Sequence, residues 1–366
     1  MGIVWKYGAQ AIPRAAGRVD RIERTGNDIL VEGWMLLPGV PNGFPLVFVD
    51  SVFQGPATEV IREDVARVHP WVADAQKAGF LYRGPIENSV RNEKWASLEL
   101  IRGDPSRPLA YLNTLIPMTP QSSLPCPPLD LVRQIGSPDA PSYAEQGRKS
   151  FSDFDQAIGR NLDGIKINRL LDWGCGCGRI SSYFLDIRPD IEITGCDVAS
   201  NCVEWCKSHL PGGRFFRSGL FPPLDFPDRH FDVVIASSVM THLTRNSQLD
   251  WLREMRRILS PGGLFLASVL GRYSAARECH APVSIRQRLR AHFSRRKAGL
   301  GSTKPGIDDR VQNRSLDGIV PAGYYRNVFQ TAEYTREVWS KEMEVLDYIE
   351  RGLDSYQDLV IVRRPD

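Results

Sequence analysis

A strand-like apolar run ends in Asp172 and is followed by three alternating glycines. The segment reads Leu-Leu-Asp-Trp-Gly-Cys-Gly-Cys-Gly-Arg, and its glycines are Gly174, Gly176 and Gly178. Glycine lets a backbone turn tightly and approach a ligand closely. Asp197 ends the next apolar run, 19 residues after Gly178, where a carboxylate can accept hydrogen bonds from ribose hydroxyls. This spacing predicts a nucleoside-type ligand at one edge of a parallel sheet, against the alternatives of a plain tight turn and an ordinary strand-end acid.

The spacing of the glycines separates two kinds of nucleotide-binding turn. A dinucleotide site uses Gly-x-Gly-x-x-Gly, whereas this chain has Gly-x-Gly-x-Gly after Asp172. The run Asp-x-Gly-x-Gly-x-Gly resembles motif I of the class I S-adenosylmethionine-dependent methyltransferases. Three later segments agree with that family in order and spacing, at residues 194–197, 231–237 and 259–265. The resemblance covers residues 142–270 closely and the terminal strands to residue 366 with less specificity.

The resemblance implies S-adenosylmethionine as the cofactor and assigns its contacts. Asp172 and the glycine turn would hold the methionine part, Asp197 the ribose, and Ser218 would lie near the adenine. The full predicted cofactor-binding set is Asp172, Gly174, Cys175, Gly176, Gly178, Asp197, Val198, Ser218 and Ser237.

Methyl transfer from a sulfonium to a hydroxyl needs an acceptor held in line and a group that removes its proton. Among the six histidines, His242 alone follows directly on the predicted fourth strand, at the ligand-binding edge. An unperturbed histidine titrates near about pH 6.5. We therefore predict that His242 is the catalytic base, the alternative being that it packs against or caps the next helix. Asp358 is a second catalytic candidate, because the last strand of this fold runs antiparallel and begins at the same edge.

Five of the seven cysteines fall within 32 residues, namely Cys175, Cys177, Cys196, Cys202 and Cys206. Their spacing differs from the Cys-x2-Cys pairs of ordinary zinc sites. In a reducing compartment, buried cysteine behaves as a small hydrophobe. We predict no metal site and no disulfide framework.

Elements that can position these residues follow from residue 142 onward, where β-rich runs alternate with helical stretches. The runs lie at residues 169–173, 191–196, 214–217, 231–237, 264–270, 343–349 and 358–364. Alternation of this kind predicts an α/β fold with a Rossmann-like, mainly parallel sheet of seven strands. An insertion at residues 271–330 interrupts it. Residues 272–297 hold eight basic side chains against one acid, net +7, which fits a lid for an acidic substrate or a solvated loop.

The chain before residue 119 carries short β-rich runs between turn residues and is predicted to be a β-sandwich, residues 1–118. Nine prolines among residues 105–141 predict a linker at 119–141, which leaves residues 142–366 as the methyltransferase domain. The first domain resembles the small β-sandwich domains attached to bacterial glycosyltransferases of surface-polysaccharide assembly. That resemblance implies a sugar hydroxyl of a glycan or its precursor as the acceptor, unless the domain only stabilises or dimerises the enzyme.

Composition and charge limit the partners and the cellular location that we expect for this chain. The net charge of +3 over 366 residues argues against nucleic acid as a partner. The sequence shows no membrane-spanning run and no signal-peptide pattern, so a cytoplasmic protein is expected. Three alternatives stay open: a small-molecule methyltransferase, an N-methyltransferase, and a non-catalytic S-adenosylmethionine-binding protein with a glycan-binding domain. Acceptor identity and homo-oligomer formation lie beyond the sequence.

Overall fold

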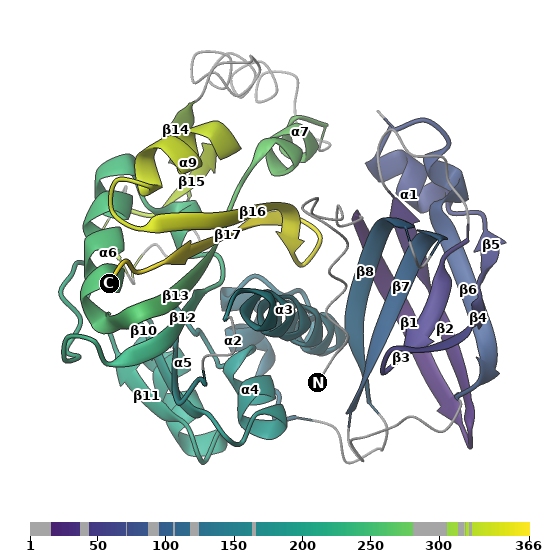
Figure 1. The fold of residues 1–366 in the computed structure, drawn as a ribbon, viewed down its shortest axis with the longest axis horizontal. Coiled ribbons are helices and arrows are strands. Elements are labelled where there is room, and N and C mark those ends of the chain that lie inside the picture. Colours follow the sequence, from purple (N-terminus) through teal and green to yellow (C-terminus); the bar gives the residue numbers. More distant parts are fainter. Residues whose placement is uncertain are drawn as a thin grey trace. The chain divides into compact units, whose positions relative to one another are not determined.

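The structure is a computed structural model that divides the chain into two units (Figure 1). One comprises residues 1–123 with 349–356, and the other residues 124–348 with 357–366. The residues that it describes are 16–36, 44–70, 72–86, 95–104, 107–117, 124–162, 166–280, 306–313, 318, 320–321 and 324–366. Among them, no helix is both long enough and apolar enough to cross a membrane.

The first unit contains two four-stranded antiparallel sheets. One has the order β1 (Ala16–Thr25), β2 (Asp28–Leu36), β6 (Gly79–Pro85), β5 (Thr58–Val60), and the other β4 (Val52–Pro56), β3 (Leu46–Val49), β7 (Trp95–Asp104), β8 (Arg107–Pro117). Buried residues alternate along β2 because successive side chains of a strand point to opposite faces. Val31 from one sheet and Leu98 from the other belong to a single apolar core. Two sheets that share a core make a small β-sandwich, accompanied by the short helices α1 (Glu63–Val68) and η1 (Ala75–Ala78).

The structure differs from the predicted linker at residues 119–141. Helix α2 (Leu129–Gln134) lies inside this segment, and α3 (Ala140–Asn161) begins in it. The prolines stand where a helix tolerates them, because Pro128 precedes the first turn of α2 and Pro141 lies within the first turn of α3. The dense prolines therefore mark the starts of α2 and α3 as well as a connecting segment.

Seven strands from residue 169 onward form one sheet. Their order is β11 (Arg214–Arg217), β10 (Glu192–Asp197), β9 (Arg169–Trp173), β12 (Phe231–Ala236), β13 (Leu259–Val269), β17 (Gln357–Arg363), β16 (Glu344–Leu353). The strands from β11 to β13 pair in parallel, whereas β17 runs antiparallel to β13. The carboxyl ends of β9 to β13 and the start of β17 consequently lie along one edge of the sheet.

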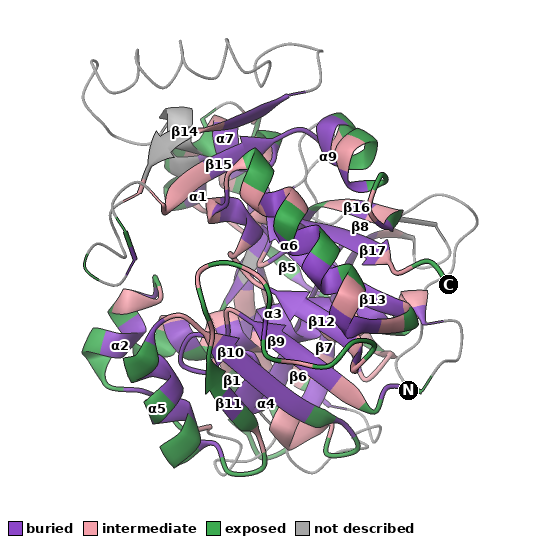
Figure 2. Cartoon of the chain, turned by 90° about the vertical axis from the view of Figure 1, so that its left-hand side faces the viewer, coloured by how far each residue is buried: buried purple, intermediate pink, exposed green. Residues whose placement is uncertain are grey.

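Helices cover the sheet, whose strands are mostly buried while the helices expose their outer sides (Figure 2). They are α3, α4 (Ser181–Ile187), α5 (Ser200–His209), η3 (Met240–His242), α6 (Arg245–Ile258), α7 (Arg272–His280) and α9 (Ala332–Trp339). Trp251 of α6 packs on Trp173 of β9, with ring centroids 4.5 Å apart. Apolar contacts of this kind fix the helices against the sheet and leave its carboxyl edge to carry polar groups.

The insertion contributes a two-stranded antiparallel sheet, β14 (Ile307–Gln312) and β15 (Arg326–Gln330). Within the predicted basic lid, α7 is described, and residues 281–305 lie outside the described residues.

Two shortened proteins, one beginning at Leu124 and one at Ser142, should differ in stability, because only the first keeps α2. Helix α2 buries Leu131 and Val132, and full burial of such a side chain stabilises a protein by about 1.5 to 3 kcal/mol. We expect the protein that begins at Ser142 to unfold at a lower urea concentration, measured by tryptophan fluorescence. Equal midpoints would show that α2 adds nothing to the second unit.

Candidate functional site

The turn after β9 is built on three glycines with positive φ, 77° at Gly174, 52° at Gly176 and 69° at Gly178. Residues with a Cβ rarely adopt this conformation. A Cβ at Gly174 would collide with Val239, and one at Gly176 would lie 3.0 Å from Cγ2 of Ile135. The glycines therefore permit both the backbone shape of the turn and the close packing of Val239 and Ile135 against it.

Asp197, at the end of β10, ties this turn to the neighbouring strand. Its Oδ2 accepts from the Gly176 N–H at 2.8 Å, and its Oδ1 accepts from the Ala199 N–H at 2.8 Å. Burial raises the pKa of the Asp197 carboxyl, and the backbone N–H donors oppose that shift. Each carboxylate oxygen has a second lone pair, so the group can still accept hydrogen bonds from a ligand.

Asp172 lies beneath the turn, 1% exposed. Its Oδ2 accepts from the Ser181 hydroxyl at 2.6 Å, which links β9 to the start of α4. Burial raises the pKa of Asp172 to about 6. The Asp172 carboxylate thus stabilises the junction of β9 and α4 inside the fold. Its contact with a cofactor stays a prediction.

The other predicted cofactor residues lie along the same edge. Val198 follows β10, Ser218 follows β11, and Ser237 follows β12, all three half-buried. The Ser218 N–H donates to the Asp197 carbonyl at 2.9 Å. The sheet thereby brings together residues that are far apart in the sequence.

The five clustered cysteines are buried free thiols. Contact with Cys202 and burial raise the pKa of the Cys177 thiol, and burial raises that of Cys196. Cys175 and Cys206 pack in one apolar cluster beneath the turn. In the described part of the chain, no three His, Cys, Asp or Glu side chains are placed to hold a metal ion. These thiols pack as small apolar side chains beneath the glycine turn.

His242, in η3 directly after β12, is held by two residues of the insertion. Its Nδ1 lies 2.6 Å from the Arg326 carbonyl oxygen, and its ring stacks on Tyr325 with centroids 3.8 Å apart. Since a carbonyl only accepts, Nδ1 carries the hydrogen and the lone pair resides on Nε2. Burial lowers the pKa of His242 to about 4, which corrects the expected titration near neutrality.

Asp358 lies at the same edge, beside Val269 at the end of β13. It is 2% exposed, and its Oδ2 accepts from the Tyr348 hydroxyl at 2.7 Å. A Cβ at Gly271 would collide with this carboxylate, so the two residues are closely packed. A buried carboxylate engaged in this way is a weaker candidate base than His242.

Helix α2 covers the glycine turn, a feature that the sequence analysis missed. Ile135 follows α2 and packs over Gly176. Gln134 and Asn201 exchange side-chain hydrogen bonds of 2.8 and 3.3 Å, which join α2 to α5 (Figure 2). Capping of α3 by Asp139, which accepts from the Ser142 N–H at 2.8 Å, was the signal that could have revealed a helical segment here.

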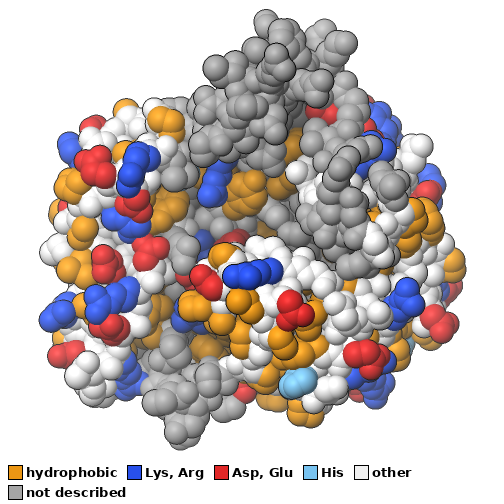
Figure 3. Space-filling view, turned by 180° about the vertical axis from the view of Figure 1, so that it is seen from behind, with side chains coloured by type: hydrophobic (Ala, Val, Ile, Leu, Met, Phe, Trp, Pro, Cys, Tyr) orange, Lys and Arg blue, Asp and Glu red, His pale blue; other side chains and the backbone are white. Residues whose placement is uncertain are grey.

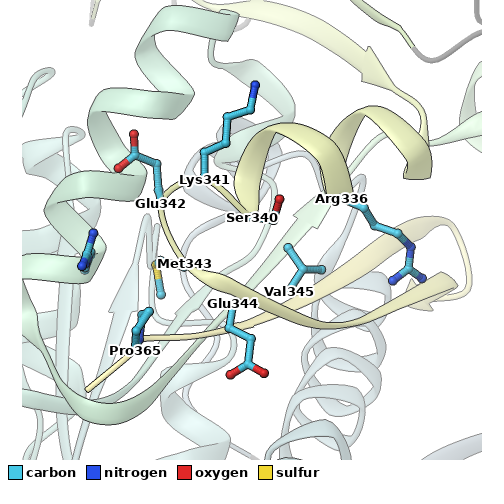
Figure 4. Close-up of a pocket in the computed structure, with 9 residues that line it drawn as sticks. Arg336, Ser340, Lys341, Glu342, Met343, Glu344, Val345 and Pro365 are labelled. Carbon is cyan, nitrogen blue, oxygen red and sulfur yellow. The ribbon is translucent and has the colours of Figure 1, made fainter.

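A separate pocket of about 580 Å³ lies at the opposite edge of the sheet, where β16 begins and β17 has ended (Figure 4). Its lining side chains Arg336, Lys341 and Glu344 point in different directions. Because its charges do not converge and none of the predicted site residues lines it, the pocket is distinct from the candidate site.

Substitution of Asp172 tests its bracing role. Alanine would leave the buried Ser181 hydroxyl without its acceptor, which costs about 1 to 3 kcal/mol. Asparagine keeps an acceptor oxygen and removes a charge that burial disfavours. We expect urea unfolding at pH 8 to show Asp172→Ala well below wild type and Asp172→Asn at or above it.

The pH dependence follows from the sign of the shift. A folded-state pKa of about 6, raised from 3.8, favours folding most below pH 3.8, and this benefit is lost as the pH rises through 6. The advantage of Asp172→Asn over wild type should therefore shrink at pH 5. Equal destabilisation by asparagine and alanine at pH 8 would contradict this account.

Comparisons with known proteins agree with the geometry of the site. Residues 170–263 match the family model described as a methyltransferase domain. An uncharacterized methyltransferase of Schizosaccharomyces pombe is 32% identical over 204 residues, which cover 53% of this chain and 71% of that protein. A fatty-acid O-methyltransferase of Mycolicibacterium smegmatis is 35% identical over 103 residues, 28% of this chain and 37% of that protein.

The chain spans about two-fifths of the length of this fatty-acid O-methyltransferase. Among solved structures, the N-methyltransferase NodS of Bradyrhizobium japonicum aligns over 65% of this chain and 97% of its own, with 14% identity and a TM-score of 0.39. The match to more than two-thirds of the yeast methyltransferase identifies the family. The chain belongs to the S-adenosylmethionine-dependent methyltransferases.

Proposed function

We propose that this methyltransferase acts on a hydroxyl oxygen and that His242 is its general base. The residues at the sheet edge fit the cofactor, because Asp197 retains free lone pairs beside the tight glycine turn. In this proposal, the turn holds the methionine part, Asp197 the ribose, and Ser218 lies near the adenine. The bound sulfonium supplies an activated methyl group.

The hydrogen bond between Nδ1 of His242 and the Arg326 carbonyl carries the proposal. It leaves the Nε2 lone pair available. Among the described residues, several buried side-chain nitrogen and oxygen atoms lack a hydrogen-bond partner, and Nε2 of His242 is not one of these atoms. With a pKa of about 4, the imidazole is neutral at physiological pH. A neutral imidazole can accept the proton of a hydroxyl, whereas an amine acceptor needs only to arrive deprotonated.

We further propose that the acceptor is a sugar hydroxyl of a bacterial glycan or its lipid-linked or nucleotide-linked precursor. Phe221, 62% exposed, meets Tyr324 edge to face at 5.4 Å. Tyr324 adjoins the tyrosine that stacks on His242, and exposed aromatic faces suit the C–H face of a sugar ring. On the face drawn in Figure 3, basic and acidic side chains are interspersed.

A small-molecule acceptor is the second candidate, because the exposed rings of Phe216 and Phe221 suit an apolar small molecule as well. We also place the enzyme in the cytoplasm, since its clustered cysteines are unpaired thiols and thiols persist in reducing compartments.

The acceptor class is tested by transfer of tritium from labelled S-adenosylmethionine. UDP-glucose, a polyprenyl-diphosphate-linked sugar, a nucleotide-linked amino sugar, a catechol and a fatty acid are offered in parallel. We expect label in an ether-linked methyl group of one of the sugars. Label found only in the catechol or the fatty acid would select the second candidate, and label found only on an amine would refute O-methylation.

Asp197→Ala should weaken the binding of S-adenosylhomocysteine, measured by calorimetry. Hydrogen bonds to a charged acceptor contribute about 1.5 to 3 kcal/mol each, so loss of two predicts a decrease in affinity of more than a hundredfold. Asp250→Ala, which removes an exposed acid of α6 paired with Arg253, is the matched control and should bind like wild type. Equal affinities of the two variants would place the ribose elsewhere.

His242→Ala should lower kcat by about 10² to 10⁴ and leave the affinity for S-adenosylhomocysteine nearly unchanged, because a general base acts in the transition state. The wild-type kcat should be independent of pH above about pH 6 and fall as the pH drops through about 4, where His242 becomes protonated. Full activity of the variant would remove His242 from the mechanism and turn attention to Asp358.

A further inference from the structure

We infer that the last part of the insertion, residues 324–330, positions the catalytic base, with Tyr325 as the positioning residue. This inference rests on the proposed role of His242. Tyr325 and Arg326 hold the imidazole in one tautomer and one orientation, and β15 holds these two residues in place.

Two adjacent residues restrain different motions of the same ring. Tyr325 lies 3.8 Å from His242, centroid to centroid, at an angle of 25°, and so restrains the plane of the imidazole. The Arg326 carbonyl accepts from Nδ1 at 2.6 Å, across 84 residues of sequence, and so selects the end of the ring that carries the hydrogen. Together the two contacts direct Nε2 away from the insertion.

A buried network of amide side chains joins β15 to the segment that carries His242. Nε2 of Gln248 donates to the Met240 carbonyl at 3.0 Å, to the Leu243 carbonyl at 3.3 Å and to Oε1 of Gln330 at 2.9 Å. Oε1 of Gln248 accepts from the Trp339 indole at 3.3 Å. Gln248 thus bonds both sides of η3 and the end of β15. Its amide has all these partners inside the core, where such networks are rigid.

Gln330 is held equally firmly. Its Nε2 donates to the Thr335 hydroxyl at 2.7 Å, and its backbone N–H donates to the Leu270 carbonyl at 2.9 Å, next to the end of β13. Gln330 and Thr335 are fully buried. These bonds fix the register of β15 against the main sheet and, through it, the position of Tyr325.

Charged groups also lie near the two positioning residues. Burial and then the negative charge of Asp197 raise the pKa of the Tyr325 hydroxyl. Among charged groups on the packed elements, the Arg326 guanidinium donates to the Asp309 carbonyl at 3.1 Å, and the Asp309 carboxylate accepts from the Arg245 N–H at 3.1 Å. The pKa of His242 itself is lowered by burial, which the Arg326 carbonyl opposes.

Nitrogen NMR of the full-length protein with ¹⁵N-labelled histidine tests the inference without any acceptor. In wild type we expect His242, assigned by its loss in His242→Ala, to show the Nδ1–H tautomer and to titrate near pH 4. Tyr325→Leu should expose the ring and raise the pKa of His242 by about one unit or more. Tyr325→Phe keeps the stacked ring and should behave like wild type.

Tyr324→Leu is the matched control, since Tyr324 is the neighbouring tyrosine and bonds the Leu220 carbonyl. It should leave the His242 signals unchanged. Binding of S-adenosylhomocysteine checks that each variant is folded, and Tyr325→Met is measured in the same way if Tyr325→Leu unfolds. An unchanged pKa of His242 in the variant lacking the ring would overturn the inference.

Kinetics with an acceptor that the enzyme methylates separate this inference from the proposed function. Tyr325→Leu should lower kcat about tenfold with little change in the KM for the acceptor, and it should have no further effect in the His242→Ala background. Additive losses in the double variant would mean that Tyr325 does not act through His242. If His242→Ala is fully active while Tyr325→Leu still changes the His242 NMR signals, His242 is not the general base. The contact by which Tyr325 positions the ring would then still stand.

Discussion

The hydrogen bond from the Gly176 N–H to the Asp197 carboxylate, 2.8 Å long, is the interaction on which the site depends. It joins the turn after the first strand of the sheet to the end of the second, so the shape of the turn and the place of the acid are set together. The positive φ values of the glycines permit this turn, and α2 covers it from outside through Ile135. In the proposed binding mode, the acid that accepts from the ribose hydroxyls therefore also shapes the backbone beneath the methionine part.

The catalytic side of the site is assembled differently, by contacts between distant segments. His242 comes from the end of β12, while the carbonyl and the ring that hold it come from the insertion. Burial disfavours the charged imidazolium, which lowers the pKa of His242 to about 4 and keeps the ring neutral. At physiological pH the neutral ring keeps its lone pair available to accept a proton, while the lowered pKa makes it a weaker base than an unperturbed histidine. Burial thus fixes the orientation of the ring and reduces its basicity.

Local patterns predicted the fold well. The strands from residue 169 onward, the glycine turn and Asp197 follow from apolar runs and spacing, because each feature is encoded within a few residues. The helix α2 escaped prediction because Pro128 stands directly before it. The stack of Tyr325 on His242 joins residues more than eighty apart, and the direction of the His242 pKa depends on burial. Neither has a local signature, so only the folded chain reveals them.

A crystal structure of the complex with S-adenosylhomocysteine tests the central claim most directly. The account predicts ribose hydroxyls within about 2.6 to 3.2 Å of the Asp197 carboxylate and the homocysteine part along the turn at Gly174 to Gly178. It also predicts that Nε2 of His242 faces the sulfur while Nδ1 stays on the Arg326 carbonyl. A ligand bound away from this edge, or a His242 ring turned from the sulfur, would contradict the account.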